Sequence, residues 1–277
     1  MIRLIVVTTL AMLAFAGNSL LCRVALRDTA IDAASFTSIR LASGALVLAM
    51  IVAARRGRPM AAGSWKAAAC LFGYAAAFSF AYRQLSAATG ALLLFGAVQT
   101  AMLAWGLATG ERLRALQVAG LVVAVGGLVY MLLPGLAAPP IEGAAFMIAA
   151  GIAWAGYTLL GRGTTDPVNA TAGNFIRSVP FAAALSLAVA SGTSVDRTGA
   201  LYAVASGAVT SGLGYVLWYA ALPSLKAASA AVIQLSVPAI AALGGVLLLA
   251  EPLSSRLVIA SVTILGGIAL TILRPRT

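Results

Sequence analysis

Three side-chain amides, Asn18, Gln99 and Gln234, lie in the middle of long apolar stretches of the chain. An amide can donate a hydrogen bond to a carboxylate and accept one from an ammonium group, so it suits a ligand that carries both charges. Amides also join helices inside membranes, and this structural role stays open for all three. Pro238 lacks an N–H, so it leaves the carbonyl of Gln234 free as an acceptor at an expected kink.

Aromatic side chains recur at helical spacing and could stack on a flat or apolar ligand group. The candidates for this wall are Phe78, Tyr82, Trp154, Tyr157, Tyr215 and Trp218. Tryptophan and tyrosine near helix ends instead form belts at membrane interfaces, an interpretation that fits Trp218 better than Phe78 or Trp154. Gly212 and Gly214 are expected to let their helix bend during gating.

The chain offers little for acid–base or metal chemistry. It contains no histidine. Its seven acids, all expected in loops or at helix ends, are Asp28, Asp32, Glu111, Glu142, Asp166, Asp196 and Glu251. This pattern leaves no central carboxylate or imidazole for a conventional proton relay. Cys22 and Cys70 fall toward opposite ends of their helices and indicate no disulfide. We therefore expect no cofactor, no metal site and no enzyme activity.

Two arginines, Arg40 and Arg177, fall about two turns into apolar helices. They could form an anion site for a carboxylate or a phosphate. Alternatively they are structural, with the guanidinium reaching the interface or binding backbone carbonyls. We favour the structural role because both lie nearer to helix ends than to helix centres. Exposure of either arginine to a central cavity would reverse this preference.

The elements that hold these residues are transmembrane helices. Of 277 residues, 62% are hydrophobic and 9% are charged, whereas soluble domains have about 25% charged residues. Apolar stretches of about 20 residues match the hydrocarbon thickness of a bilayer. The predicted helices are 4–25, 33–54, 64–82, 86–108, 114–133, 142–161, 168–190, 199–220, 226–249 and 256–273. The sequence thus predicts an all-α integral membrane protein with ten transmembrane helices.

The distribution of charge predicts how these helices are oriented. The net charge of +11 could indicate nucleic acid binding, but alternation of ten helices places eleven basic residues on one side and five on the other. This bias follows the positive-inside rule, puts both termini in the cytoplasm and argues against a nucleic acid partner. Arg3 and Ala14-Phe15-Ala16 resemble a signal peptide with its cleavage site. The apolar run continues beyond Ala16, so we favour an uncleaved first span.

An internal repeat relates the two halves of the chain. The segment that begins at Gly110 aligns with the segment that begins at Ala250, so that Glu111 falls on Glu251 and Gly127 on Gly267. The predicted repeats are residues 1–138 and 139–277, each with five helices. Because five is odd, the second repeat enters the membrane in the opposite sense. Many secondary transporters have such inverted repeats and bind substrate between them.

These features resemble the drug/metabolite transporter superfamily, and more narrowly its ten-helix EamA-like branch. The resemblance rests on FAGNSLLCR in the first helix, TGERL after the fourth, AEPLS after the ninth and the paired glycines of the fifth and tenth, and it covers the whole chain. It implies export of small metabolites through a central cavity. Members similar to this chain include exporters of aromatic amino acids.

The expected function is therefore export of amino acids, including aromatic ones, or related metabolites across the inner membrane. Alternating access around a central cavity would move the substrate down its own gradient. An antiporter for phosphorylated sugars or nucleotide sugars, using Arg40 and Arg177, is the alternative, and a membrane-embedded enzyme is less favoured. The bilayer and a small-molecule substrate are the expected partners, and the sequence leaves the oligomeric state open.

Overall fold

The computed structural model describes residues 2–110, 114–135, 138–162, 164–225 and 233–272, and within them the chain forms helices and no strands. The helices of the first half are α1 (Ile2–Asp28), α2 (Ala33–Ala54), α3 (Trp65–Tyr82), α4 (Ala87–Ala108) and α5 (Ala115–Leu132). Those of the second half are α6 (Ile141–Leu160), α7 (Pro167–Ala188), α8 (Arg197–Val204), η2 (Ala205–Leu213), α9 (Gly214–Ala221), α11 (Ser236–Leu249) and α12 (Ser255–Ile272). Two short 3₁₀ turns are η1 (Ala190–Gly192) and η3 (Leu222–Ser224).

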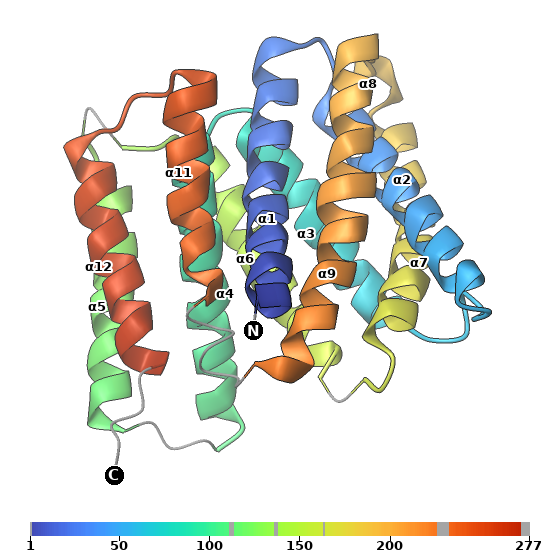
Figure 1. Ribbon diagram of the computed structural model, residues 1–277. Helices are drawn as coiled ribbons and strands as arrows, with labels where there is room; N and C mark the ends of the chain where they lie inside the picture. Colours follow the sequence, from blue (N-terminus) through green and yellow to red (C-terminus); the bar gives the residue numbers. More distant parts are fainter. Residues whose placement is uncertain (1, 111–113, 136–137, 163, 226–232, 273–277) are drawn as a thin grey trace.

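Segments α8, η2 and α9 follow one another without a break and form one rod, which we call the α8–α9 rod (Figure 1). With this rod counted once, the described residues contain ten long helical segments lying side by side. The predicted all-helical membrane fold is confirmed, and six of the segments are long and apolar enough to cross a bilayer. The first part of the predicted helix 226–249 lies outside the described residues, and α11 begins at Ser236.

Side-chain caps at the helix starts explain where many of the helices begin. The cap residues that accept a backbone N–H are Asp32 for α2, Ser64 for α3, Ser86 for α4, Asp166 for α7 and Asp196 for α8. Each satisfies a donor that the first helical turn leaves without an intrahelical partner. Partial burial raises the pKa of Asp32, but hydrogen bonds from Ser35, Ser194 and Ala34 outweigh it and hold this pKa below its ordinary value.

Contacts between the two halves build the core. Helix α2 packs on α7, α4 on α11, and α5 on α12, while α3 packs on α6 and α1 on the α8–α9 rod. Small residues allow some of these helices to approach closely. A Cβ placed on Gly120 of α5 would lie 2.5 Å from the carbonyl oxygen of Gly267 in α12. Backbones at this separation pack by van der Waals contact, as is typical of helices in membranes.

Candidate functional site

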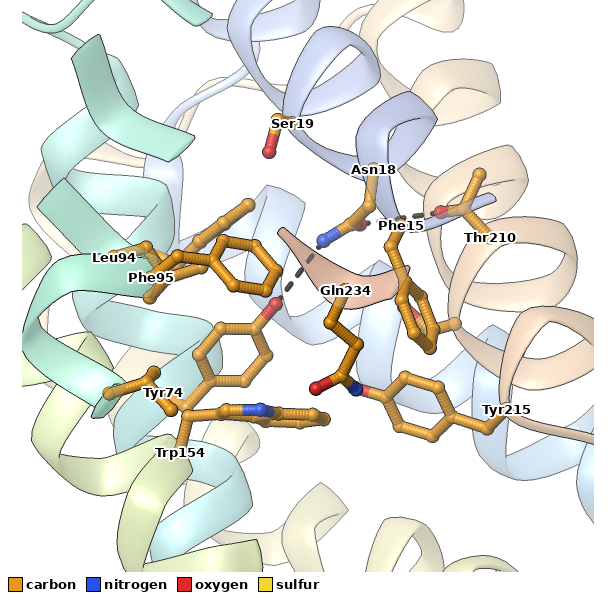
Figure 2. A pocket seen from close by; sticks show the side chains of 13 residues that line it. Phe15, Asn18, Ser19, Tyr74, Leu94, Phe95, Trp154, Thr210, Tyr215 and Gln234 are labelled. Atoms are coloured by element: carbon orange, nitrogen blue, oxygen red, sulfur yellow. Dashed lines mark hydrogen bonds between the residues drawn. The ribbon is translucent and has the colours of Figure 1, made fainter. Parts of the chain in front are cut away.

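A cavity lies near the middle of the bundle, between helices of both halves. The residues that line it are Phe15, Asn18, Ser19, Tyr74, Phe78, Leu94, Phe95, Val98, Trp154, Thr210, Ser211, Tyr215 and Gln234. They come from α1, α3, α4, α6, η2 and α9, and from the residues just before α11 (Figure 2). The free volume is about 40 Å³, room for a few water molecules, whereas ligand pockets usually have about 300–1,000 Å³. The helices must therefore separate before a metabolite can fit.

Asn18 of α1 is the centre of a hydrogen-bond network on one wall of the cavity. Its Nδ2 donates to the hydroxyl oxygen of Tyr74 at 3.3 Å, and its Oδ1 accepts from Ser206 at 2.7 Å and from Thr210 at 3.3 Å. These contacts join α1 to α3 and to η2, so the amide has a structural role. Because Asn18 also lines the cavity, a moving substrate would meet this network directly.

Aromatic rings form most of another wall, as Figure 2 shows for Tyr74, Trp154 and Tyr215. The ring of Trp154 lies 4.8 Å from that of Tyr74 and 5.5 Å from that of Tyr215, measured between ring centroids. Phe78 continues this row, with its centroid 5.3 Å from that of Tyr74. Rings at these separations attract one another beyond their burial of apolar surface. The row can therefore offer aromatic ring surface to a substrate, although neighbouring rings are tilted by 50–54° to one another.

Gln234 enters the cavity from a helical residue pair, Ile233 and Gln234, which a turn at Leu235 separates from α11. Figure 2 shows its amide directed toward the rings of Trp154 and Tyr215. The regular helix begins only at Ser236, with Leu235 as its first cap, and Pro238 lies within the first turn. Proline favours this position because the N–H that it lacks would have no intrahelical partner there.

Five of the nine predicted binding residues line the cavity: Asn18, Phe78, Trp154, Tyr215 and Gln234. The other four lie outside its lining. Tyr82 is buried against Phe78 and donates to the carbonyl of Ala87 at 3.3 Å. Tyr157 stacks on Trp154 at 5.3 Å, and Trp218 packs edge-on against Phe15 at 6.2 Å, so both support rings that line the cavity. Gln99 is half-buried on α4, one residue beyond Val98 of the lining.

Arg40 lies directly behind the wall of the cavity, a position that the sequence did not predict. The side chain is only 2% exposed, and its Nη2 donates to Tyr74 at 3.2 Å and its Nε to Ser211 at 3.4 Å. Both of these partners line the cavity. The guanidinium carbon also lies 5.1 Å from the centroid of the Phe78 ring. The structural role that we favoured for Arg40 is therefore incomplete, because this cation adjoins the cavity.

Arg177 has the structural role that the sequence indicated. Its Nη1 donates to the carbonyls of Ala62 at 2.8 Å and Gly173 at 3.1 Å, and its Nη2 donates to that of Met60 at 3.1 Å. These bonds fasten the loop between α2 and α3 to α7. Both arginines were predicted about two turns into apolar helices, but the structure gives them different surroundings. Only tertiary contacts distinguish them.

The middle of the α8–α9 rod is a π-helix rather than a regular α-helix. It covers Ala205–Leu213, which includes Gly212, and Gly214 starts the α-helix that follows. The widened turn brings Thr210 and Ser211 to the cavity. A Cβ on Gly207 would lie 2.0 Å from the carbonyl oxygen of Arg40, so α2 and the π-helix are in backbone contact there. Such π-helical turns are frequent at functional sites, and the sequence analysis missed this one.

Charged groups close one end of the bundle beyond the cavity. Glu251, which follows α11, is 7% exposed and accepts from Arg23 of α1 at 2.9 Å and from the backbone N–H of Ala87 at 2.8 Å. Arg23 also donates to the carbonyl of Tyr82 at 3.0 Å. This cluster, the Glu251 latch, joins α1, the end of α3, the start of α4 and the end of α11. In the described part of the chain, no group of three or more Cys, Asp or Glu residues could hold a metal ion.

Comparison with known proteins identifies a family domain in the second half of the chain. Residues 141–273 match the model of the EamA-like transporter family. The chain therefore contains an EamA-like transporter domain. This domain confirms the predicted relation to the drug/metabolite transporter superfamily and assigns the second half of the chain to a family of membrane transporters. Together with the apolar helices, it identifies a multi-pass membrane protein. The match covers α6 to α12, which supply Trp154, Thr210, Ser211, Tyr215 and Gln234 to the cavity.

Two relatives and one solved structure are also similar to this chain. An uncharacterized protein of Pseudomonas aeruginosa is 58% identical over 99% of this chain and 96% of its own length. An uncharacterized transporter of Archaeoglobus fulgidus is 30% identical over 58% of this chain and 59% of its own length. A crystal structure described only as that of a protein has a TM-score of 0.66, with 20% identity over 96% of both chains. At this identity the likeness establishes a shared fold alone.

Proposed function

We propose that this EamA-like protein exports small amphipathic metabolites, with aromatic amino acids as the expected substrate class. The observation that carries the proposal is the cavity, in which an aromatic row faces the amides of Asn18 and Gln234. An amino acid needs hydrogen-bond partners for its charged groups and an apolar wall for its side chain. The cavity combines both kinds of surface.

Alternating access is the mechanism that the geometry supports best. The free volume of about 40 Å³ is far below that of usual ligand pockets, and the Glu251 latch closes one end of the bundle. The cavity lies between α1, α3 and α4 of the predicted first repeat and α6 and the α8–α9 rod of the second. Rocking of one repeat against the other would open the cavity to each side in turn. The family match over residues 141–273, close to the predicted second repeat 139–277, supports this division.

The concentration gradient of the substrate itself is the simplest source of energy for transport through this cavity. Its described lining contains no carboxylate and no imidazole that could carry a coupled proton. We further propose that the protein lies in the inner membrane with both termini in the cytoplasm. The charge bias of the sequence supports this orientation.

The alternative, an antiporter for phosphorylated or nucleotide sugars, has less support. It requires several cations at the cavity, because a phosphate group carries up to two negative charges. Among the described residues, Arg40 alone adjoins the lining, whereas Arg177 binds backbone carbonyls of the loop between α2 and α3.

Counterflow in proteoliposomes tests the proposed function. Vesicles that hold the purified full chain and unlabelled phenylalanine should accumulate labelled phenylalanine, and labelled alanine more weakly. Vesicles without protein give the background, and Val262→Ala, at a lipid-facing position of α12, serves as the matched control variant. Exchange of glucose 6-phosphate without exchange of phenylalanine would instead support the antiporter.

A further inference from the structure

Arg40 is a buried cation without a carboxylate partner in the described part of the chain. Its contacts are the hydroxyls of Tyr74 and Ser211 and the faces of the Tyr74 and Phe78 rings, and its Nη1 has no hydrogen-bond partner there. A buried charge is costly to leave unpaired, and in a membrane protein it marks a functional site by default. Hydroxyls and ring faces offset only part of this cost.

The acids of the described residues all have other partners. Glu251 pairs with Arg23, Asp28 with Arg27, and Glu142 accepts from Gln84. The other three, Asp32, Asp166 and Asp196, cap the starts of helices. None of the six lines the cavity, so no described acid compensates Arg40.

Tyr74 connects this cation to the cavity. Its hydroxyl oxygen accepts from Nη2 of Arg40 at 3.2 Å and from Nδ2 of Asn18 at 3.3 Å. Two accepted bonds use both lone pairs of the oxygen, so the O–H proton is left to donate. Tyr74 lines the cavity, and the adjoining guanidinium makes this hydroxyl a stronger donor toward an anion.

We propose that Arg40 and Tyr74 form the docking site for a carboxylate group of the substrate, and that the cavity therefore prefers a net anion to a zwitterion or a cation. Tyr74 donates the contact, and Arg40 supplies the positive charge in a site of low dielectric constant. The described lining contains no acid to pair with an ammonium group, which Arg40 would repel. Among ligands with the same ring, the cavity thus binds an aromatic monocarboxylate more tightly than the corresponding amino acid. This inference rests on the proposed function and specifies the substrate class of the same cavity.

A net anion would also gain an energy source. Its export moves one negative charge outward, and the inside-negative potential of a cell membrane favours this direction. A potential of 100 mV supports a gradient of about fiftyfold for a monovalent ion. A zwitterion gains nothing from the potential, so voltage dependence distinguishes the two kinds of substrate.

Three probes with the same ring and different charge test the proposal in proteoliposomes: 3-phenylpropionate, phenylalanine and 2-phenylethylamine. For the unaltered protein we expect the apparent affinity to fall in that order. Efflux of 3-phenylpropionate should accelerate when a potassium gradient with valinomycin makes the interior negative. Equal affinity for all three probes, or a preference for the amine, would overturn the proposal without any variant.

Variants of Arg40 and Tyr74 test whether these residues cause the preference for an anion. Arg40→Gln should weaken 3-phenylpropionate about tenfold or more, because it removes the positive charge that attracts the carboxylate in a site of low dielectric constant, and it should not weaken 2-phenylethylamine. Arg40→Lys should retain part of the preference for the anion because it retains the charge, and Tyr74→Phe should weaken the anion with the charge still in place. Arg177→Gln is the matched control, since it removes a guanidinium that binds loop carbonyls.

The possible outcomes separate this inference from the proposed function. If Arg40→Gln and Arg40→Lys weaken all three probes equally in folded protein, Arg40 is structural and the docking site is wrong, although phenylalanine export stands. If the unaltered protein transports none of the three, the proposed function itself fails. Monodispersity and thermal unfolding of each variant in detergent identify misfolded protein. If the variants are misfolded, the order of apparent affinity of the unaltered protein for the three probes decides the test.

Discussion

Nε of Arg23 donates a 2.9 Å hydrogen bond to Oε1 of Glu251 and so ties α1 to the segment after α11, 228 residues further along the chain. The other carboxylate oxygen accepts the backbone N–H of Ala87 at the start of α4. One carboxylate therefore holds three helices together beyond the cavity. Because α1 and α11 belong to different predicted repeats, opening this end of the cavity has to break the pair.

Glu251→Gln should weaken this end of the bundle. The substitution leaves Arg23 without its charged partner in a site where the two side chains are 14% and 7% exposed. Losing one member of a buried pair costs about 3 kcal/mol, so the temperature of unfolding in detergent should fall. A cysteine at Ser19, in protein whose Cys22 and Cys70 are replaced by alanine, should react faster with a membrane-impermeant thiol reagent. Asp28→Asn is the control, since Asp28 pairs with Arg27 at the surface, where a pair contributes little.

Ala250→Gly should stabilise the protein. Ala250 ends α11 with a φ of 51°, in the left-handed region where a side chain costs about 1–2 kcal/mol and glycine fits without strain. Part of this gain is lost to the greater entropy of glycine in the unfolded chain, so we expect a net gain of about 0.5–1 kcal/mol. Thermal unfolding measures it. Ala108→Gly, at the exposed end of α4, should destabilise by a similar amount and shows the usual effect of glycine in a helix.

Trp154→Ala should change the selectivity of transport. Trp154 lies between the rings of Tyr74 and Tyr215, and losing this face should cost about 1 kcal/mol for an aromatic substrate. Transport of phenylalanine should then weaken several-fold more than transport of alanine. Gln234→Ala should weaken both alike, because every amino acid presents the same charged groups. An unchanged ratio in Trp154→Ala, at matched expression, would show that the tryptophan only packs the core.

Transport of phenylalanine should not respond to a proton gradient. No described lining residue is an acid, so a coupled proton has no carrier in the cavity. The measurement compares flux in proteoliposomes with and without an imposed pH difference at the same substrate gradient. Proton-driven accumulation of phenylalanine against its own gradient would reveal a coupling route elsewhere in the chain.

Both termini should face the cytoplasm, and residues 134–141 should face outward. Single cysteines replacing Arg3, Arg276 and Pro139 are labelled from each side of the membrane with an impermeant reagent. Labelling of Arg3→Cys from the outside alone would contradict the orientation that the charge bias predicts. In the predicted orientation the Glu251 latch closes the outer side of the cavity. Labelling of Arg3→Cys from the outside alone would place the latch on the cytoplasmic side.

The sequence alone determined the class of the protein and the number of its helices. In lipid every backbone group must be satisfied within the chain, so long apolar stretches can only be helices, and their length follows from the bilayer. Helix caps such as Asp32 and Ser86 are local features, because each cap bonds to backbone groups within the first helical turn. The sequence also indicated which residues could line a central cavity. A buried amide such as Asn18 is rare in an apolar transmembrane helix, so it stands out in the sequence.

The tertiary structure decided which of these residues share a wall. Arg40 and Arg177 have equivalent sequence positions, yet one adjoins the cavity and the other binds a loop, because their neighbours come from segments far away in the chain. The π-helix of Ala205–Leu213 likewise lies against the backbone of α2 at Gly207, a contact between segments far apart in the chain. Tyr157 and Trp218 stand behind lining rings because the rotation of each helix about its axis is set by packing. Hydropathy does not reveal that rotation for aromatic residues, since they occur in the cavity wall as well as in the core behind it.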